Sequence, residues 1–169
     1  HLEASHTAAV IEMGMNHFGE ISRLTRAVAP TVGLITNIGV SHIENLGSRA
    51  GILQAKLEIL EGMAPDAPLI VNMDNDMLRT VKLGDRPLLT FAIDDQSADF
   101  TATDIAEQGS TTTFTVHHST FNQPVTIPTV GIHNVYNALA AMAVGYVPGV
   151  NPAAAASALA NYVPAGMRQ

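Results

Sequence analysis

Short apolar runs alternate with amphipathic stretches along the first half of the chain. Four runs have the length and composition of buried strands: residues 8–13, 32–38, 68–73 and 88–93. The stretches between them repeat apolar residues every three to four positions, which predicts helices over 19–29 and 48–63 and a short one over 76–83. Apolar strands that alternate with amphipathic helices predict a mainly parallel sheet with helices on both faces.

The pattern changes near Asp99. From there to residue 129, short alternating runs rich in threonine and valine predict a set of antiparallel hairpins, with Pro124 and Pro128 at edge positions. Alanine-rich helices are predicted over 134–145 and 152–162, the second opened by an Asn151-Pro152 cap. We therefore expect an α/β fold, a mainly parallel sheet flanked by helices, with a small antiparallel addition.

Composition restricts the class of protein. The length of 169 residues suits one domain, and 47% hydrophobic residues can form a sizeable core. The net charge of −7 argues against a nucleic-acid surface, and the absence of cysteine excludes disulfides and thiolate sites. No apolar run reaches the roughly 18 residues of a membrane span, so a cytoplasmic protein is expected. The chain starts at His1 rather than methionine and is read as part of a longer protein.

One lysine occupies an unusual position in the predicted helix 48–63. The apolar stripe of this helix consists of Ile52, Ala55, Ile59, Leu60 and Met63, with Gln54, Glu58 and Glu61 on the opposite face. Lys56 lies four residues after Ile52 and four before Leu60, within the stripe. Such a lysine must extend to solvent, pair with an anion or lose its charge. Extension to solvent is the ordinary outcome for a lone lysine, but other polar residues point to a site.

Three of these polar residues are predicted at one edge of the sheet. Glu12 ends the first predicted strand, Asn37 lies at the end of the second, and His42 follows in the next loop. Parallel sheets bind ligands at the carboxyl ends of their strands, where a carboxylate and an imidazole can hold Mg²⁺ or Mn²⁺. Neither spacing is a specific metal signature. Glu12 is equally well read as a capping or solvated carboxylate, and His42 as a capping or core histidine.

A second polar pair lies where a helix is predicted to begin. Asn134 and Asn137 are three residues apart and share a helix face, where their amides suit the edge of a purine. The alternative is an N-cap at Asn134 with Asn137 as a packed polar residue. The stretches 74–76 and 94–95 are read as turns. The chain contains no G-x-x-x-x-G-K-S/T loop, which an ATP-using protein would need from elsewhere.

Four segments together resemble a known family. They are EMGMNHFGEI (12–21), TNIGVSHIENLGS (36–48), AKLEIL (55–60) and GIHNVYNALAA (131–141). In this order and spacing they resemble the Mur ligases over nearly the whole chain, and the first is most similar to the branch that adds D-alanyl-D-alanine to UDP-N-acetylmuramoyl-tripeptide in peptidoglycan precursor synthesis. The resemblance implies a P-loop-type central ATP-binding domain. It also implies a reaction in which ATP phosphorylates the substrate carboxylate and an amine then attacks the acyl phosphate.

The resemblance also implies roles for individual residues. Glu12, His42 and Lys56 match the family's Mg²⁺-binding and catalytic positions, Lys56 as a carbamylated lysine. Asn134 and Asn137 match positions that meet adenine, Arg168 matches an arginine near the phosphates, and Asn37 lies in the loop that lines the phosphate channel.

The chain also departs from the family pattern. The family's first strand and phosphate loop would precede His1, and its UDP-sugar-binding and C-terminal domains have no counterpart here. We therefore expect residues 1–169 to be a partial central domain that is inactive alone. The alternatives are another Mur ligase, a folylpolyglutamate-type ligase, or a non-catalytic nucleotide-binding module.

Overall fold

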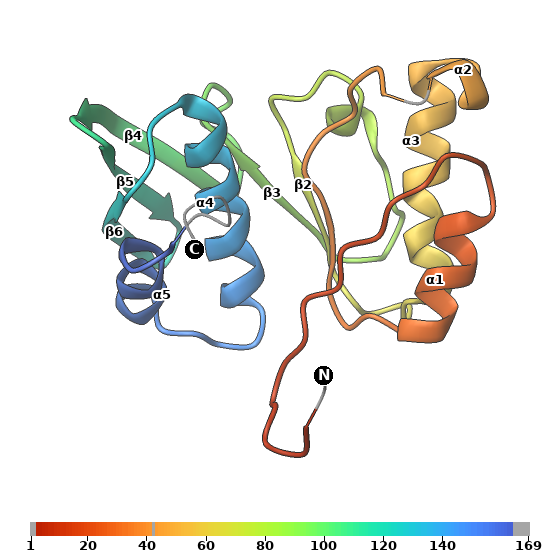
Figure 1. Cartoon of the computed structure of the whole chain (residues 1–169), viewed down its shortest axis with the longest axis horizontal. Helices are drawn as coiled ribbons and strands as arrows, with labels where there is room; N and C mark the ends of the chain where they lie inside the picture. The colour runs from red at the N-terminus through yellow and green to blue at the C-terminus, as the bar shows by residue number, and fades with distance from the viewer. Residues whose placement is uncertain (1–2, 42, 164–169) are drawn as a thin grey trace.

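In the computed structural model, which describes residues 3–41 and 43–163, the strands form one six-stranded sheet (Figure 1). Its strands follow one another in chain order: β1 (Gly33–Ile35), β2 (Leu69–Asn72), β3 (Leu88–Ala92), β4 (Phe100–Gln108), β5 (Thr111–His118) and β6 (Phe121–Ile127). The first four are parallel, and β5 and β6 continue the sheet in antiparallel pairing. The predicted parallel sheet with an antiparallel addition is confirmed.

Helices cover both faces of this sheet, as predicted. On one side lie α1 (Glu20–Val28), α2 (Ile43–Leu46), α3 (Arg49–Leu57) and the 3₁₀ turn η1 (Glu58–Gly62); on the other lie α4 (Ile132–Tyr146) and α5 (Pro152–Ala160) (Figure 1). Strand side chains alternate between faces, so Ile70 joins the core under α4 while Leu69 and Val71 join the core under α1 and α3. In the described part of the chain, no helix is both long and apolar enough to cross a bilayer.

The strand predicted over residues 8–13 is absent. The segment is irregular and exposed, with Val10 at 92% and Ile11 at 50% exposure. A strand requires a neighbour that completes its hydrogen bonds, and within the described residues β1 pairs only with β2. The apolar sequence was therefore not sufficient to form a strand, and Glu12 lies in coil rather than at a strand end.

The helix predicted over 48–63 is divided in two. Ser48 caps α3 by accepting the Gly51 N–H at 3.1 Å, and the regular helix ends at Leu57, where η1 begins. Glu58, the first residue of η1, is partly buried and faces α1. Its carboxylate accepts the Gly19 N–H at 2.8 and 3.0 Å and the Ser22 N–H at 3.1 Å. Glu58 thus caps a helix whose own N-cap, Gly19, has no side chain to do so.

The remaining predicted helices differ in length or in type. The short helix predicted over 76–83 is reduced to the 3₁₀ turn η2 (Leu78–Thr80), and α4 begins two residues earlier than predicted, at Ile132. The predicted cap of α5 is confirmed, because Asn151 Oδ1 accepts the N–H groups of Ala153 and Ala154 at 2.9 and 3.4 Å.

Candidate functional site

A pocket of about 450 Å³ lies at the carboxyl ends of β1 and β2, facing the first turns of α4. It is lined by Thr36, Asn37, Asn72, Asp74, Asn75, Ile132, His133, Tyr136 and Asn137. This is the edge at which parallel α/β sheets bind ligands. Amide, carboxylate and phenol groups converge there from three separate segments of the chain.

Lys56 reaches this edge from α3. Its side chain is half-buried, and Nζ donates a 2.8 Å hydrogen bond to the main-chain carbonyl of Asn37. Burial lowers the pKa of the Lys56 amine. The structure therefore brings together two of the predicted site residues. The partner of Lys56 is a neutral carbonyl, so its contact differs from both an ion pair and simple extension to solvent.

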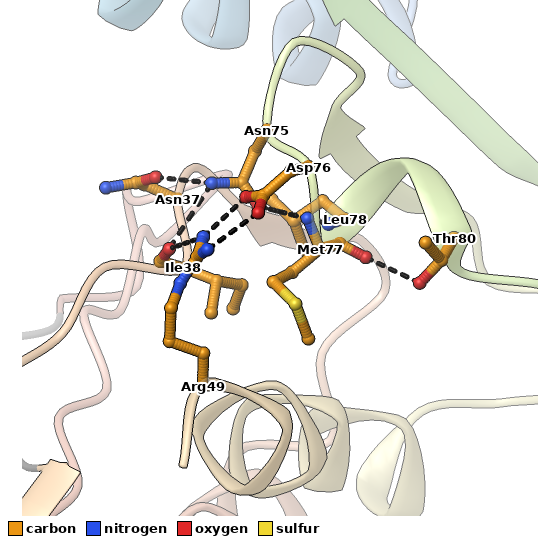
Figure 2. A network of polar contacts seen from close by, with 8 residues as sticks. All are labelled: Asn37, Ile38, Arg49, Asn75, Asp76, Met77, Leu78 and Thr80. Carbon is orange, nitrogen blue, oxygen red and sulfur yellow. Dashed lines mark hydrogen bonds and ion pairs between the residues drawn. The ribbon is translucent and has the colours of Figure 1, made fainter.

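Asn75 links the loops that follow β1 and β2 (Figure 2). Its Nδ2 donates to Asn37 Oδ1 at 2.7 Å and more weakly to the Ile38 carbonyl at 3.4 Å. Its Oδ1 accepts the N–H groups of Met77 and Leu78 at 3.2 and 3.0 Å. Both ends of the amide are thereby engaged, and the position of Asn37 is tied to the turn after β2.

Arg49 supports the same loop from the start of α3 (Figure 2). The guanidinium donates to both carboxylate oxygens of Asp76, at 2.6 and 2.5 Å, and to the Ile38 carbonyl at 2.9 Å. The hydrogen bonds to Arg49 hold the pKa of Asp76 below its ordinary value. Because Asp76 is exposed, the pair adds little to stability, and its main effect is to orient the loop.

Asp74 joins the sheet to α4 on the other side of the pocket. Its carboxylate accepts the N–H groups of Ile93, Asp94 and Asp95 at 2.6, 3.0 and 2.9 Å, and the Tyr136 hydroxyl at 2.8 Å. Burial favours the neutral acid, but the four hydrogen bonds together outweigh it and lower the pKa of Asp74. Burial and the neighbouring carboxylate raise the pKa of Tyr136, which stays a neutral donor.

The predicted adenine-facing pair is only partly in this pocket. Asn137 lines it, whereas Asn134 Nδ2 donates to the Val130 carbonyl at 2.7 Å. The alternative in which Asn134 caps the helix is wrong, because the N-cap position of α4 is Gly131. Asp74 and Asn75 do lie in a turn as predicted. Their side chains also form hydrogen bonds to distant segments, which the prediction of a turn did not include.

The predicted metal ligands are not assembled by the described residues. Glu12 is exposed in coil, and His42 lies outside the residues that the structure describes, as does Arg168, which was predicted near the phosphates. Within residues 3–41 and 43–163, no three histidine, aspartate or glutamate side chains are placed to hold a metal ion.

A second hollow, of about 540 Å³, lies beside the amino ends of β2 and β3. It is lined by Pro65, Asp66, Leu83, Asp85, Arg86 and Pro87. Arg86 donates there to the carbonyls of Ala64 and Ala67 at 2.6 and 2.9 Å, which is a loop-supporting role. Although larger, this hollow lies at the sheet edge opposite to the one where such folds bind ligands, so the pocket beside α4 is the candidate site.

The sequence of the chain matches a known protein family. The profile of the Mur ligase middle domain matches residues 1–145. The UDP-N-acetylmuramoyl-tripeptide–D-alanyl-D-alanine ligase of Bacillus subtilis is 40% identical over 170 residues, which cover 95% of this chain and 34% of that protein. The chain thus spans about a third of the length of this curated relative.

Solved structures give the same relationship. MurF from Acinetobacter baumannii superposes with a TM-score of 0.89 and 32% identity, over 97% of this chain and 36% of that one. MurF from Thermotoga maritima, solved in complex with ADP, superposes with a TM-score of 0.75 over 86% of this chain and 33% of that one. At 22% identity, the second comparison shows the shared fold alone.

Proposed function

Because the chain belongs to the Mur ligase middle-domain family, we propose that it is the ATP-binding middle domain of a ligase that joins D-alanyl-D-alanine to UDP-N-acetylmuramoyl-tripeptide. The observation that carries this proposal is the pocket between the carboxyl ends of β1 and β2 and the start of α4. The substrates come from the curated relatives, and the nucleotide from the ADP complex of the Thermotoga protein.

The pocket fits a nucleotide in size and chemistry. Small-molecule sites commonly have volumes of roughly 300–1,000 Å³ and combine apolar walls with a few polar groups. Here Ile132 and Tyr136 supply the apolar wall, and Asn137 offers both a donor and an acceptor to a purine edge. We assign the adenine to the α4 side, with Asn134 contributing through its Oδ1 from the neighbouring position. The phosphates extend toward Asn37, with Arg168 assigned near them.

Glu12, His42 and Lys56 are assigned to Mg²⁺. When bound, this ion would neutralise charge on the phosphates during formation of the acyl phosphate. Glu12 offers an exposed carboxylate, and a carbamate on Lys56 would add oxygen ligands of the kind that hard cations prefer.

The environment of Lys56 favours this modification. Burial lowers the pKa of the amine and so increases the neutral fraction, which is the form that attacks CO₂. A C–N bond forms and one proton is released. The carbamate nitrogen keeps one hydrogen, with which it can still donate to the Asn37 carbonyl, the present partner of Nζ.

Calorimetric titration of a ligase that has this chain as its middle domain with MgADP tests the nucleotide site. Asn137→Ala should weaken ADP binding, while Asn161→Ala, at an exposed asparagine at the end of α5, should not. The ligation itself requires a ligase in which this chain is the middle domain, supplied with UDP-N-acetylmuramoyl-tripeptide. ADP release should require D-alanyl-D-alanine. Turnover with a folate and glutamate instead, or failure of that ligase to bind ADP, would contradict the proposal.

A further inference from the structure

The direction of two side-chain amides at the site is determined by a chain of donors and acceptors. The main-chain N–H groups of Met77 and Leu78 can only donate, so the atom that faces them must be Asn75 Oδ1. Asn75 Nδ2 therefore faces Asn37 and donates to it at 2.7 Å. The accepting atom must be Asn37 Oδ1, so the Nδ2 group of Asn37 is turned away from Asn75. Figure 2 shows this nitrogen pointing away from the other side chains drawn.

The main chain of Asn37 is held as firmly as its side chain. Lys56 Nζ donates to the Asn37 carbonyl at 2.8 Å, and Arg49 donates to the carbonyl of Ile38 at 2.9 Å. Asn37 is nevertheless exposed and lines the pocket. Its NH₂ group is thus held in a fixed direction, turned away from Asn75, on a residue that lines the pocket.

We propose that Asn37 Nδ2 donates a hydrogen bond to a phosphate oxygen of the bound nucleotide, and that Asn75 is a positioning residue that keeps this donor turned toward the ligand. The inference rests on the proposed nucleotide site. Asn37 lies at the Lys56 end of the pocket, while the apolar and aromatic wall that suits a base lies on α4. An N–H donor binds an anionic oxygen strongly, whereas an amide carbonyl in its place would repel it.

Substitutions at Asn75 distinguish its effect on the orientation of the Asn37 amide from its effect on the stability of the loop. Asn75→Asp keeps one oxygen for the Met77 and Leu78 N–H groups but places a second oxygen against Asn37 Oδ1. Asn37 then relieves the repulsion by rotating, which directs its own oxygen at the phosphate. Asn75→Ala removes the acceptor for both N–H groups but leaves Asn37 free to turn either way. We therefore expect Asn75→Ala to be the less stable variant and Asn75→Asp the weaker binder of ADP.

Nitrogen-15 NMR and calorimetry with MgADP test this in a ligase that has this chain as its middle domain. The side-chain NH₂ resonances of Asn37 are identified by their loss in Asn37→Asp. ADP should shift them in the wild type but not in Asn75→Asp, and ADP binding should weaken roughly ten- to hundredfold in both Asp variants, as for a lost hydrogen bond to a charged group. Adenosine, which lacks phosphate, should leave these resonances unmoved. Asn151→Asp, which adds the same charge at a cap that tolerates it, should bind ADP as the wild type does.

The contrary outcomes are distinct. If ADP affinity falls further in Asn75→Ala than in Asn75→Asp, affinity follows stability and the positioning role is wrong. If adenosine shifts the Asn37 resonances as ADP does, the phosphate assignment is wrong. If the wild type binds ADP but Asn75→Asp matches it, only this inference fails. If the wild-type ligase does not bind ADP, the proposed function fails as well.

Discussion

Lys56 Nζ lies 2.8 Å from the main-chain oxygen of Asn37, so the last turn of α3 is joined by a hydrogen bond to the carboxyl end of β1. This contact brings an amine of lowered pKa to the rim of the pocket. The carbonyl is neutral, so it does not fix the lysine as an ammonium ion. A free amine and a carbamate nitrogen both keep an N–H group that can donate to this carbonyl.

Substitution of Lys56 distinguishes these two states in a ligase with this chain as its middle domain. An ammonium would repel Mg²⁺, whereas a carbamate would bind it. Lys56→Ala should nearly abolish ligation and leave the fold intact, and added acetate should restore part of the rate by filling the vacated anion position. Lys56→Arg should also fail, because arginine keeps its charge and cannot form the carbamate. Ligation rates at matched Mg²⁺ are the measurement.

Lys82→Arg, at an exposed position, is the matched control and should keep its full ligation rate. A near-normal rate in Lys56→Arg would show that no carbamate is needed.

Tyr136→Phe should destabilise the chain by removing the hydrogen bond between α4 and Asp74. The lost contact is a 2.8 Å bond to a carboxylate that keeps three main-chain donors, so we expect the free energy of unfolding to fall by about 1 kcal/mol. Urea unfolding measures this change. Tyr162→Phe removes the same hydroxyl from an exposed tyrosine and should change the free energy of unfolding by less than about 0.5 kcal/mol. Equal effects of the two substitutions would argue against a structural role for the Asp74–Tyr136 bond.

Low pH should reduce the stability of the folded chain, partly through protonation of Asp74. Its pKa is lower in the folded state, so the unfolded chain binds more protons in the acid range and stability falls with pH. The contribution is complete above the unfolded value of about 3.9 and is lost as pH falls through the lower folded value. Asp74→Asn should be less stable than the wild type at pH 7, and the difference should shrink between about pH 4 and pH 2.

Urea unfolding over this pH range, with Asp66→Asn as a control at an exposed loop carboxylate, measures the effect. A constant difference between Asp74→Asn and the wild type at all pH values would mean that Asp74 does not titrate as inferred.

The chain alone should neither hydrolyse ATP nor form an amide. Its sequence contains no G-x-x-x-x-G-K-S/T loop, so the backbone cradle, the lysine and the Mg²⁺-binding hydroxyl that such loops provide are not supplied by these residues. A coupled assay for released phosphate should stay at background. Clear turnover that disappears in Glu12→Ala would show that the remaining residues suffice for catalysis.

Local sequence patterns were sufficient to predict most of the elements. The strands β2 and β3 follow from short apolar runs, and α4 follows from an apolar run of helical length. The helix α1 forms as predicted, but it buries Ile21 and Thr25 and leaves Leu24 and Val28 exposed. Residues 8–13 have an equally apolar pattern but form no strand, because a strand depends on a partner as well as on its own residues. Lys56 could be singled out from the sequence, because it is a charged residue within an apolar stripe of its predicted helix.

The sequence by itself thus determined the class of fold, the sheet edge that carries the candidate site and the unusual position of Lys56 in its helix. Only the tertiary structure decided how the pocket is built. Asn75 meets Asn37 across 38 residues of sequence, and Tyr136 meets Asp74 across 62. Asp74 and Asn75 have the composition of an ordinary turn, so no local pattern distinguishes them. Their roles arise because the packing of two helical layers on one sheet brings β1, β2 and α4 together, and hydrogen bonds between distant segments have no periodicity along the chain.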